Sequence, residues 1–358
     1  MNETVAHLMR EATRLTQSGR LHEATAAIQR ALGSAAPSRP QTSATVPPRP
    51  AAQVLEGHVF EVGPIDSPDA NPDASPGVGE FSSGTHTQAG LTRHYKLYVP
   101  PGAAGKAVPL VVMLHGCTQN PDDFAAGTAM NERAREQGFA VLYPAQSPEA
   151  NPSRCWNWFK HNHQQRGSGE PAVLAGMTQA VMKLHGIDPR RVYIAGLSAG
   201  GAMAAIVAAA YPELFAAVGV HSGLASGAAS NLSEALAAMQ GGASGGGPRT
   251  AVPTIVFHGD QDHTVHPRNG EQVIAAVRAD GAADAQIEQG ACGQGRRYTR
   301  SAHPPSAGSA SAEHWLVHGG GHAWSGGQAS GSYTDARGPD ATREMLRFFF
   351  AHPRPPLH

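Results

Sequence analysis

The chain has 358 residues, of which 41% are hydrophobic and 15% are charged, and its formal net charge is −1. This length fits one large α/β domain with a minor appendage. The near-neutral charge gives no electrostatic basis for binding nucleic acid or an anionic membrane, and no apolar run reaches the roughly 18 residues of a transmembrane segment.

Two further observations concern the cellular compartment. The chain contains 3 cysteines, too few for a disulfide-stapled scaffold. The first 17 residues carry Glu3, Arg10, Glu11 and Arg14 and lack an uninterrupted apolar stretch, so they do not fit a secretory signal. These observations favour the cytoplasm.

Residues 1–33 predict a helical hairpin. Apolar residues recur at helical spacing from Val5 to Leu15 and again from Leu21 to Leu32, with a break at Ser18-Gly19. The pattern resembles a single tetratricopeptide-type unit, which cannot bury its apolar face alone. We therefore expect it to dock on the main domain, on a partner or on a polymer granule. A poorly ordered amphipathic extension is the alternative.

Residues 34–56 are rich in Pro, Ser, Ala and Thr and predict a flexible linker. The main domain is expected over residues 57–352, starting with an edge strand at 58–62 and a loop at 63–90. A Gly/Ser-rich surface insertion is expected at 222–248. Between these segments, apolar strands alternate with helices. The predicted strands are 93–99, 110–114, 139–143, 191–195, 216–220, 254–258 and 313–317, and the predicted helices are 121–137, 171–185, 202–210, 270–279 and 341–350. This alternation predicts a mostly parallel sheet with helices on both faces.

The most informative stretch is Gly196-Leu197-Ser198-Ala199-Gly200, which fits the G-x-S-x-G nucleophile elbow. A β-branched and aromatic strand precedes it and an alanine-rich helix follows. Such a turn lifts the serine clear of the sheet and points helix N-terminal amides at a developing oxyanion. With this elbow in place, the predicted fold class is the α/β-hydrolase fold, without a large separate lid.

A serine nucleophile needs a base and an orienting acid, which follow in the order Ser, Asp, His in this fold. Asp260 and Asp262 both follow the strand 254–258. We favour Asp262, because Asp260 stands in the tight turn after Gly259 and is expected to bond its own backbone. The predicted base is His322, after a glycine run.

The sequence offers two alternatives to His322 as the base: His318 as the base, or zinc ligation by both histidines. His318 ends a strand and should point into the fold. Zinc ligation by His318 and His322 lacks the helix and the neighbouring acid of a metalloprotease site. No metal or organic cofactor is expected. The loop from His115 to Asn120 should supply the second oxyanion donor, and we expect the backbone amides of Cys117 and Ala199 in that role, with His115 as a buried support.

Three stretches together resemble the PHB-depolymerase family of esterases: His115-Gly116-Cys117-Thr118-Gln119, Arg154-Cys155-Trp156-Asn157-Trp158-Phe159 and Gly196 to Gly201. The likeness covers about residues 90–350. It implies Ser198, Asp262 and His322 as the catalytic triad and Cys117 at the oxyanion hole. It also implies poly- or oligo(3-hydroxybutyrate) as substrate. The same family groups feruloyl and acetylxylan esterases, which are alternatives, and it makes an extracellular location an alternative as well.

Cys117 and Cys155 both adjoin the expected site, so a disulfide between them is a hypothesis, with two buried free thiols as the alternative. Three of the 4 tryptophans also fall near the site, and aromatic faces suit an aliphatic polyester or an aromatic acyl group. The candidate substrate contacts are therefore Trp156, Trp158 and Trp324, with polar contacts from Thr118, Gln119 and Asn157. A non-catalytic granule-binding protein is the alternative of another class, and an intact Ser, Asp and His argue against it.

Overall fold

The computed structural model describes residues 79–88, 90–242, 248–278, 284–292, 295–307 and 310–355. The predicted hairpin at 1–33, the linker at 34–56 and the strand at 58–62 lie outside the described residues. The boundaries of these segments therefore stay predictions.

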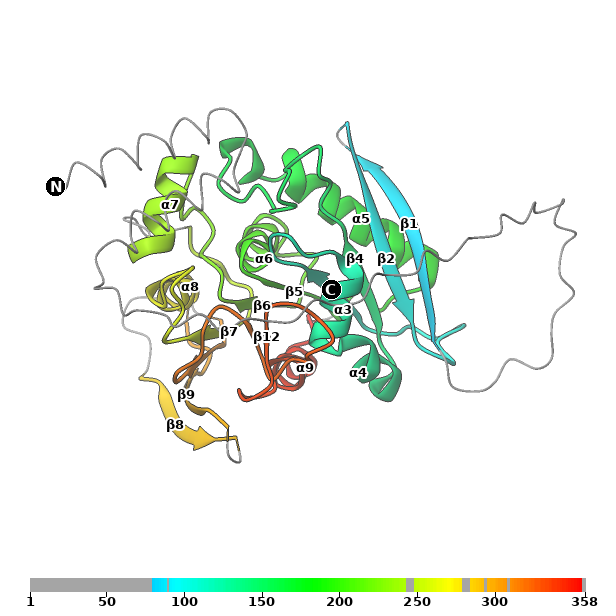
Figure 1. Cartoon of the computed structure of the whole chain (residues 1–358). Coiled ribbons are helices and arrows are strands. Elements are labelled where there is room, and N and C mark those ends of the chain that lie inside the picture. Colours follow the sequence, from blue (N-terminus) through cyan, green and yellow to red (C-terminus); the bar gives the residue numbers. More distant parts are fainter. Residues whose placement is uncertain are drawn as a thin grey trace, which may run out of the picture. The chain divides into compact units, whose positions relative to one another are not determined.

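A ten-stranded sheet organises the described residues, in the order β1-β2-β4-β3-β5-β6-β7-β10-β9-β8 (Figure 1). Its strands are β1 (Glu80–Gln88), β2 (Leu91–Val99), β3 (Leu110–Leu114), β4 (Ala140–Pro144), β5 (Val192–Leu197), β6 (Ala217–His221), β7 (Thr254–Gly259), β8 (Gln286–Ala291), β9 (Arg297–His303) and β10 (Ala312–Val317). The strands from β4 to β10 in this order are parallel, and antiparallel strands extend the sheet at both ends. Since parallel strands end at one edge, the loops after β3, β5, β7 and β10 collect there.

Helices cover both faces of the sheet (Figure 1). One face carries α5 (Gly169–His185), α6 (Ala199–Ala210) and α8 (Arg268–Val277), with α7 (Leu232–Gly241) packed on α8. The other carries α3 (Pro121–Thr128), α4 (Met130–Gln137) and α9 (Ala341–Ala351). A short 3-10 helix, η1 (His161–His163), and a two-stranded pair, β11 (Trp324–Ser325) and β12 (Thr334–Asp335), complete the described elements. None of the described helices is long and apolar enough to cross a membrane.

The central strands are apolar at every position because both of their faces are buried. In β3, Leu110, Val112 and Leu114 belong to the core under α5 and α6, and Val111 and Met113 belong to the core under α3, α4 and α9. All five are 0% exposed. This alternation with a period of two explains why continuous apolar runs correctly predict these strands.

The predictions for residues 121–137 and 63–90 need correction. The helix at 121–137 is two helices, because Ala129 adopts a left-handed conformation with φ 51° between α3 and α4. The loop at 63–90 contains β1, whose sequence is largely polar and which is held through a continuous antiparallel register with β2. Gly84 lets the Tyr95 ring lie over β1, where a Cβ would come within 2.3 Å of that ring.

Two further corrections concern the C-terminal half. The surface insertion at 222–248 contains α7. Asn231 caps the start of this helix, because its side chain accepts a hydrogen bond from the Glu234 amide. The hairpin of β8 and β9 was not predicted, since β8 is mostly exposed and carries no apolar alternation. Pairing with β10 rather than local pattern determines this end of the sheet.

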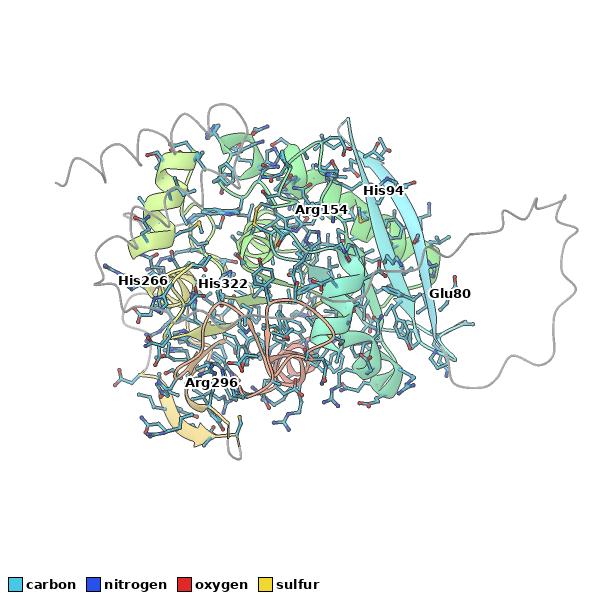
Figure 2. All side chains as sticks on the ribbon, in the orientation of Figure 1. Glu80, His94, Arg154, His266, Arg296 and His322 are labelled. Atoms are coloured by element: carbon cyan, nitrogen blue, oxygen red, sulfur yellow. A yellow bond between two sulfur atoms is a disulfide. The ribbon has the colours of Figure 1, made fainter. Side chains whose placement is uncertain are left out.

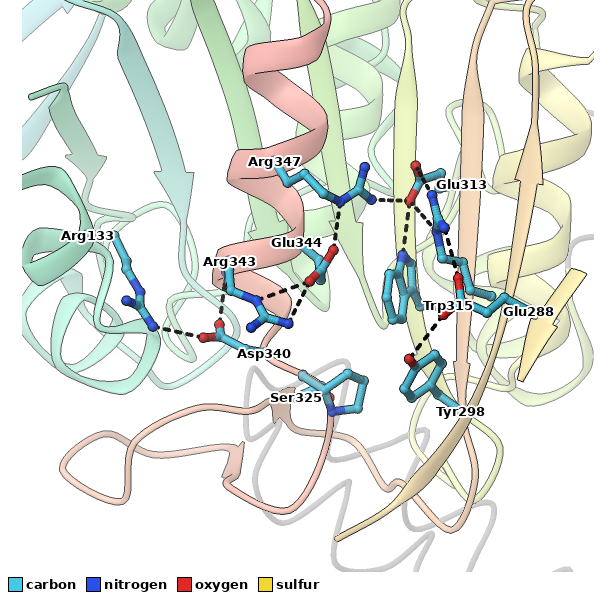
Figure 3. Close-up of polar contacts among 12 residues, drawn as sticks. Arg133, Glu288, Tyr298, Glu313, Trp315, Ser325, Asp340, Arg343, Glu344 and Arg347 are labelled. Atoms are coloured by element: carbon cyan, nitrogen blue, oxygen red, sulfur yellow. Dashed lines mark hydrogen bonds and ion pairs between the residues drawn. The ribbon is translucent and has the colours of Figure 1, made fainter. Parts of the chain in front are cut away.

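An ion network joins the end of the sheet to α9 (Figure 3). Glu313 on β10 accepts two hydrogen bonds from Arg300 on β9, at 3.0 and 2.9 Å, and another from Trp315 Nε1 at 3.2 Å. Arg347 of α9 reaches the same carboxylate and also bonds Glu344. The Glu313 side chain is 9% exposed, so this network fastens α9 to β10 from a largely buried position.

Candidate active site

Ser198 stands on a strained turn between β5 and α6. Its φ is 57° and its ψ is −120°. This backbone conformation is sterically unfavourable for a non-glycine residue and persists only where the surrounding structure holds it. A Cβ at Gly196 would lie 2.3 Å from the backbone of Gly200, and one at Gly200 would lie 2.1 Å from the Leu114 carbonyl oxygen. The two glycines of the motif are therefore required sterically, and the structure forms the predicted elbow.

The loop after β3 lies against this elbow. A Cβ added at Gly116 would come within 3.7 Å of the Ser198 Cβ. The backbone amides of Cys117 and Ala199 donate no hydrogen bond to any acceptor of the described residues. Both unpartnered N–H groups adjoin the serine, one on this loop and one at the first position of α6.

His115 holds the peptide that carries the Cys117 amide. Its Nδ1 donates to the Gly116 carbonyl at 2.8 Å, and its Nε2 accepts from the Gln146 amide at 3.1 Å. Burial lowers the pKa of His115 to about 4, so the ring is neutral and can donate at one nitrogen while accepting at the other. This geometry agrees with the expected role of His115 as a buried support.

Asp262 and His322 are hydrogen-bonded. His322, labelled in Figure 2, has its Nδ1 2.7 Å from Asp262 Oδ2, and the aspartate side chain is 0% exposed. Asp262 Oδ1 also accepts from the amides of Thr264 at 2.9 Å and Val265 at 2.8 Å. Burial alone would raise the pKa of Asp262, but hydrogen bonds from His258, His322 and the Val265 amide hold it well below the usual value. The carboxylate is therefore ionised and fixed in orientation.

His258 is a partner of Asp262 that the sequence did not suggest. Its Nε2 donates to the Val265 carbonyl at 2.8 Å and lies 3.5 Å from Asp262 Oδ2. It ends β7 together with Gly259 and is 0% exposed.

The rival residues Asp260 and His318 form a separate pair. His318 Nδ1 lies 3.0 Å from Asp260 Oδ2, and His318 Nε2 bonds Thr299 Oγ1 at 2.9 Å. Asp260 also accepts from the Gly319 amide at 2.7 Å, a backbone group on the loop after β10 rather than in its own turn, where the bond was expected. The two histidines thus bond different aspartates. Among the described residues, no group of three or more His, Cys, Asp or Glu is arranged to hold a metal ion.

Ser198, Asp262 and His322 lie on loops that follow β5, β7 and β10, which end at the same edge of the sheet. Described hydrogen bonds link Asp262 to His322 but do not include one between Ser198 Oγ and His322. Serine–histidine contacts without ligand are often longer than a hydrogen bond.

A buried carboxylate, Glu170, holds the Cys155–Trp158 loop and was missed in the sequence. It accepts from the Asn157 amide and Asn157 Nδ2, both at 2.7 Å, and from Gln146 Nε2 at 2.6 Å. Arg93 lies 3.6 Å away. Burial alone would raise the pKa of Glu170, whereas the neighbouring His163 imidazole and the hydrogen bonds from Gln146 and Asn157 lower it. No sequence motif marks this residue, because its partners come from four separate segments.

Cys117 and Cys155 are joined by a disulfide, with their Cα atoms 4.2 Å apart. It connects the oxyanion loop to the loop held by Glu170. Cys292 is a free cysteine.

Most of the predicted substrate contacts are buried. The exposed fractions of Trp156, Trp158 and Trp324 are 0%, 5% and 1%, and those of Gln119 and Asn157 are 2% and 1%. The polar atoms of four of them bond protein groups; Trp156 Nε1 bonds the His115 carbonyl and Trp324 Nε1 bonds Thr342 Oγ1, and the Gln119 and Asn157 amides are likewise bonded. This burial does not support direct substrate contact for the five side chains. Thr118 is exposed, beside Cys117.

Comparison with known proteins agrees with the fold and with a carboxylic ester hydrolase. Residues 93–298 match the family described as esterase PHB depolymerase. Poly(3-hydroxyalkanoate) depolymerase C of Paucimonas lemoignei is 34% identical over 204 residues, which is 52% of this chain and 48% of that protein. Feruloyl esterase B of Neurospora crassa is 33% identical over 129 residues, which is 36% of this chain and 43% of that protein.

Among solved structures, an acetyl xylan esterase from Aspergillus awamori has a TM-score of 0.56 at 22% identity and covers 75% of this chain and 99% of its own. This likeness shows the α/β-hydrolase fold. The chain spans about half the length of the curated relatives it matches. The family match extends over more than half of the chain, and the chain belongs to the PHB depolymerase family of esterases.

Proposed function

We propose that the protein is a serine carboxylester hydrolase with Ser198, His322 and Asp262 as its triad. His322 Nε2 removes the proton of Ser198 Oγ as this oxygen attacks the ester carbonyl carbon. The tetrahedral intermediate then collapses, and the alcohol leaves with the proton from His322. Water activated by the same imidazole hydrolyses the acyl-enzyme and releases the acid.

The observation that carries this proposal is the 2.7 Å bond between the buried Asp262 and His322, at the sheet edge where the elbow presents Ser198. An ionised aspartate on Nδ1 fixes the imidazole tautomer, leaves Nε2 as the base and stabilises the imidazolium that forms. The unpartnered amides of Cys117 and Ala199 are the proposed donors to the oxyanion.

The proposed substrate is poly- or oligo(3-hydroxybutyrate) or a related hydroxyalkanoate ester. Support comes from the family and from the depolymerase relative, which is 34% identical over 204 residues. Feruloyl or acetylxylan ester hydrolysis is the second candidate, favoured by the names of other relatives.

The first test is hydrolysis of p-nitrophenyl butyrate by the purified chain and by Ser198→Ala. Turnover that disappears in the variant supports the proposal. Equal turnover in both proteins would contradict Ser198 as the nucleophile, and no turnover in either would favour a non-catalytic binding protein. A panel of hydroxybutyrate oligomers, methyl ferulate and acetylated xylan then distinguishes the two substrate classes by kcat/KM.

We also propose that residues 1–33 contact the polymer surface, on the basis of their amphipathic sequence. Deleting residues 1–50 should reduce adsorption to poly(3-hydroxybutyrate) granules and leave p-nitrophenyl butyrate turnover unchanged. A large loss of turnover would contradict this role.

A further inference from the structure

Tyr333 is an exposed aromatic residue beside the proposed oxyanion loop. It is 48% exposed, and the other exposed large apolar side chains of the described residues lie elsewhere, on α5, α7 and β8. Its phenol oxygen lies 3.2 Å from Thr118 Oγ1, and Thr118 directly follows Cys117. The exposed phenol is therefore placed beside the loop that carries the Cys117 amide.

The backbone at both residues is strained. Tyr333 has φ 52° and Thr118 has φ 65°, in the left-handed region that bulky and β-branched side chains avoid. Such conformations persist only where the surrounding structure imposes them, and they cluster at ligand-binding sites.

Neighbouring residues impose this conformation on Tyr333. The Ser332 amide and Ser332 Oγ donate to the two oxygens of Asp123 at 2.8 and 2.6 Å, and the Trp324 amide donates to the Tyr333 carbonyl at 2.7 Å. Gln119 Nε2 donates to the Ser332 carbonyl at 3.1 Å, which ties the same segment to the oxyanion loop. The main chain of Tyr333 is therefore fixed while its ring stays exposed.

The hydroxyl groups form a directed chain. Thr118 Oγ1 donates to the Cys117 carbonyl at 2.6 Å, so its lone pairs are left to accept the Tyr333 proton. Tyr333 Oη then keeps lone pairs that accept no hydrogen bond from any described residue. A hydroxyl group on the substrate is the natural donor to this oxygen.

We propose that Tyr333, supported by Thr118, binds the free hydroxyl group on the third carbon of the acyl group, as at the hydroxyl end of an oligomer, and so selects esters whose 3-hydroxyacyl unit carries a free hydroxyl. This inference rests on the proposed function, in which the acyl oxyanion accepts from the Cys117 amide. The 3-hydroxyl is two carbons from the reacting carbonyl, and Thr118 is the residue next to Cys117. Acetyl and butyryl groups carry no oxygen at that carbon.

The test compares ethyl 3-hydroxybutyrate with ethyl butyrate, which differ by this hydroxyl and share a leaving group. Acid release is followed by pH-stat. Tyr333→Phe keeps the ring and removes the acceptor, and we expect the ratio of kcat/KM values, hydroxybutyrate over butyrate, to fall about 3- to 10-fold. Thr118→Val should lower the ratio in the same direction, and Thr118→Ser should restore it.

Tyr298→Phe is the matched control, since the Tyr298 hydroxyl faces Glu288 on β8 at 3.4 Å and should leave the ratio unchanged (Figure 3). A ratio that stays constant in Tyr333→Phe, or equal losses on both esters, would overturn the assignment while Ser198-dependent hydrolysis still upheld the proposed function. If the wild-type chain hydrolyses neither ester, the proposed function fails and this assignment fails with it.

Discussion

Two Asp–His pairs lie at the same edge of the sheet, and they differ in burial and in what the second ring nitrogen of the histidine contacts. Asp262 and His322 are 2.7 Å apart, with side chains 0% and 13% exposed. Asp260 and His318 are 3.0 Å apart, with side chains 31% and 38% exposed. Residue types and hydrogen-bonding atoms are the same, so chemistry alone does not separate them.

Burial and the second ring nitrogen separate the pairs. His318 Nε2 is occupied by Thr299 Oγ1, whereas His322 Nε2 has no hydrogen-bond partner among the described residues. Asp262 is also fixed by two backbone amides. An Asp–His pair can serve as base only where one nitrogen is held and the other is open, and where water does not weaken the interaction.

The largest expected difference in kcat is between variants of the two histidines. His322→Ala should lower kcat for p-nitrophenyl butyrate by about 10³-fold or more, because the serine loses its base. His318→Ala should change it less than about 3-fold, because exposed pairs contribute little. Comparable losses in both variants would break the distinction.

The aspartate variants should show the same ranking, with a larger loss of kcat at Asp262 than at Asp260, but with smaller losses than the histidine variants. Asp262→Asn keeps the shape but loses the charge that selects the imidazole tautomer, and kcat should fall about 10²-fold or more. Asp260→Asn should stay within about 3-fold of the wild type. Steady-state rates on one substrate check both, and a larger loss in Asp260→Asn would reverse the assignment.

The Cys117–Cys155 disulfide should affect both kcat/KM and the free energy of unfolding. Replacing Cys155 by Ser frees the loop that carries the Cys117 amide, and we expect about a 10-fold lower kcat/KM and a loss of about 2–4 kcal/mol in unfolding free energy. Chemical denaturation and steady-state kinetics measure these. Thiol titration of the denatured, non-reduced chain should give only Cys292, and three free thiols would show that the bridge is absent.

Acid should lower the free energy of unfolding through His221, a buried histidine near the Asp262–His322 pair. Burial, with the nearby His258 and His322, lowers the pKa of His221 to about 3 from 6.5. Between these two pH values the unfolded chain binds a proton at His221 and the folded chain does not. The contribution of the neutral His221 to the free energy of unfolding is therefore complete above about pH 6.5 and declines as the pH falls. His221→Asn should reduce the slope of unfolding free energy against pH by about 1.4 kcal/mol per unit in this window. Urea denaturation at several pH values measures the slope, and an unchanged slope would contradict the burial argument.

The sequence predicted the parts of the fold that depend on local pattern. The buried parallel strands and the helices between them were found because their apolar residues are continuous or periodic. β1, β8 and β9 were missed because partner strands, rather than their own side chains, hold them in the sheet. The break at Ala129 was missed because alanine gives no local signal for a left-handed residue.

The sequence identified the site residues that belong to a motif or that follow from the order of the triad along the chain. Ser198 came from the elbow, and Asp262 and His322 came from order and turn chemistry; their catalytic roles remain predictions. The Glu170 contacts could not be found, because they join residues far apart in the chain. Tryptophans near the site were read as substrate contacts, but proximity in sequence does not reveal that a ring faces the core.

Labelling with a fluorophosphonate probe tests the central claim most directly, because the probe reacts only with an activated serine. We predict one adduct, mapped by mass spectrometry to Ser198, whose rate of formation collapses in His322→Ala and persists in His318→Ala. An adduct on another residue, or labelling of Ser198 that survives His322→Ala and is lost in His318→Ala, would contradict the account.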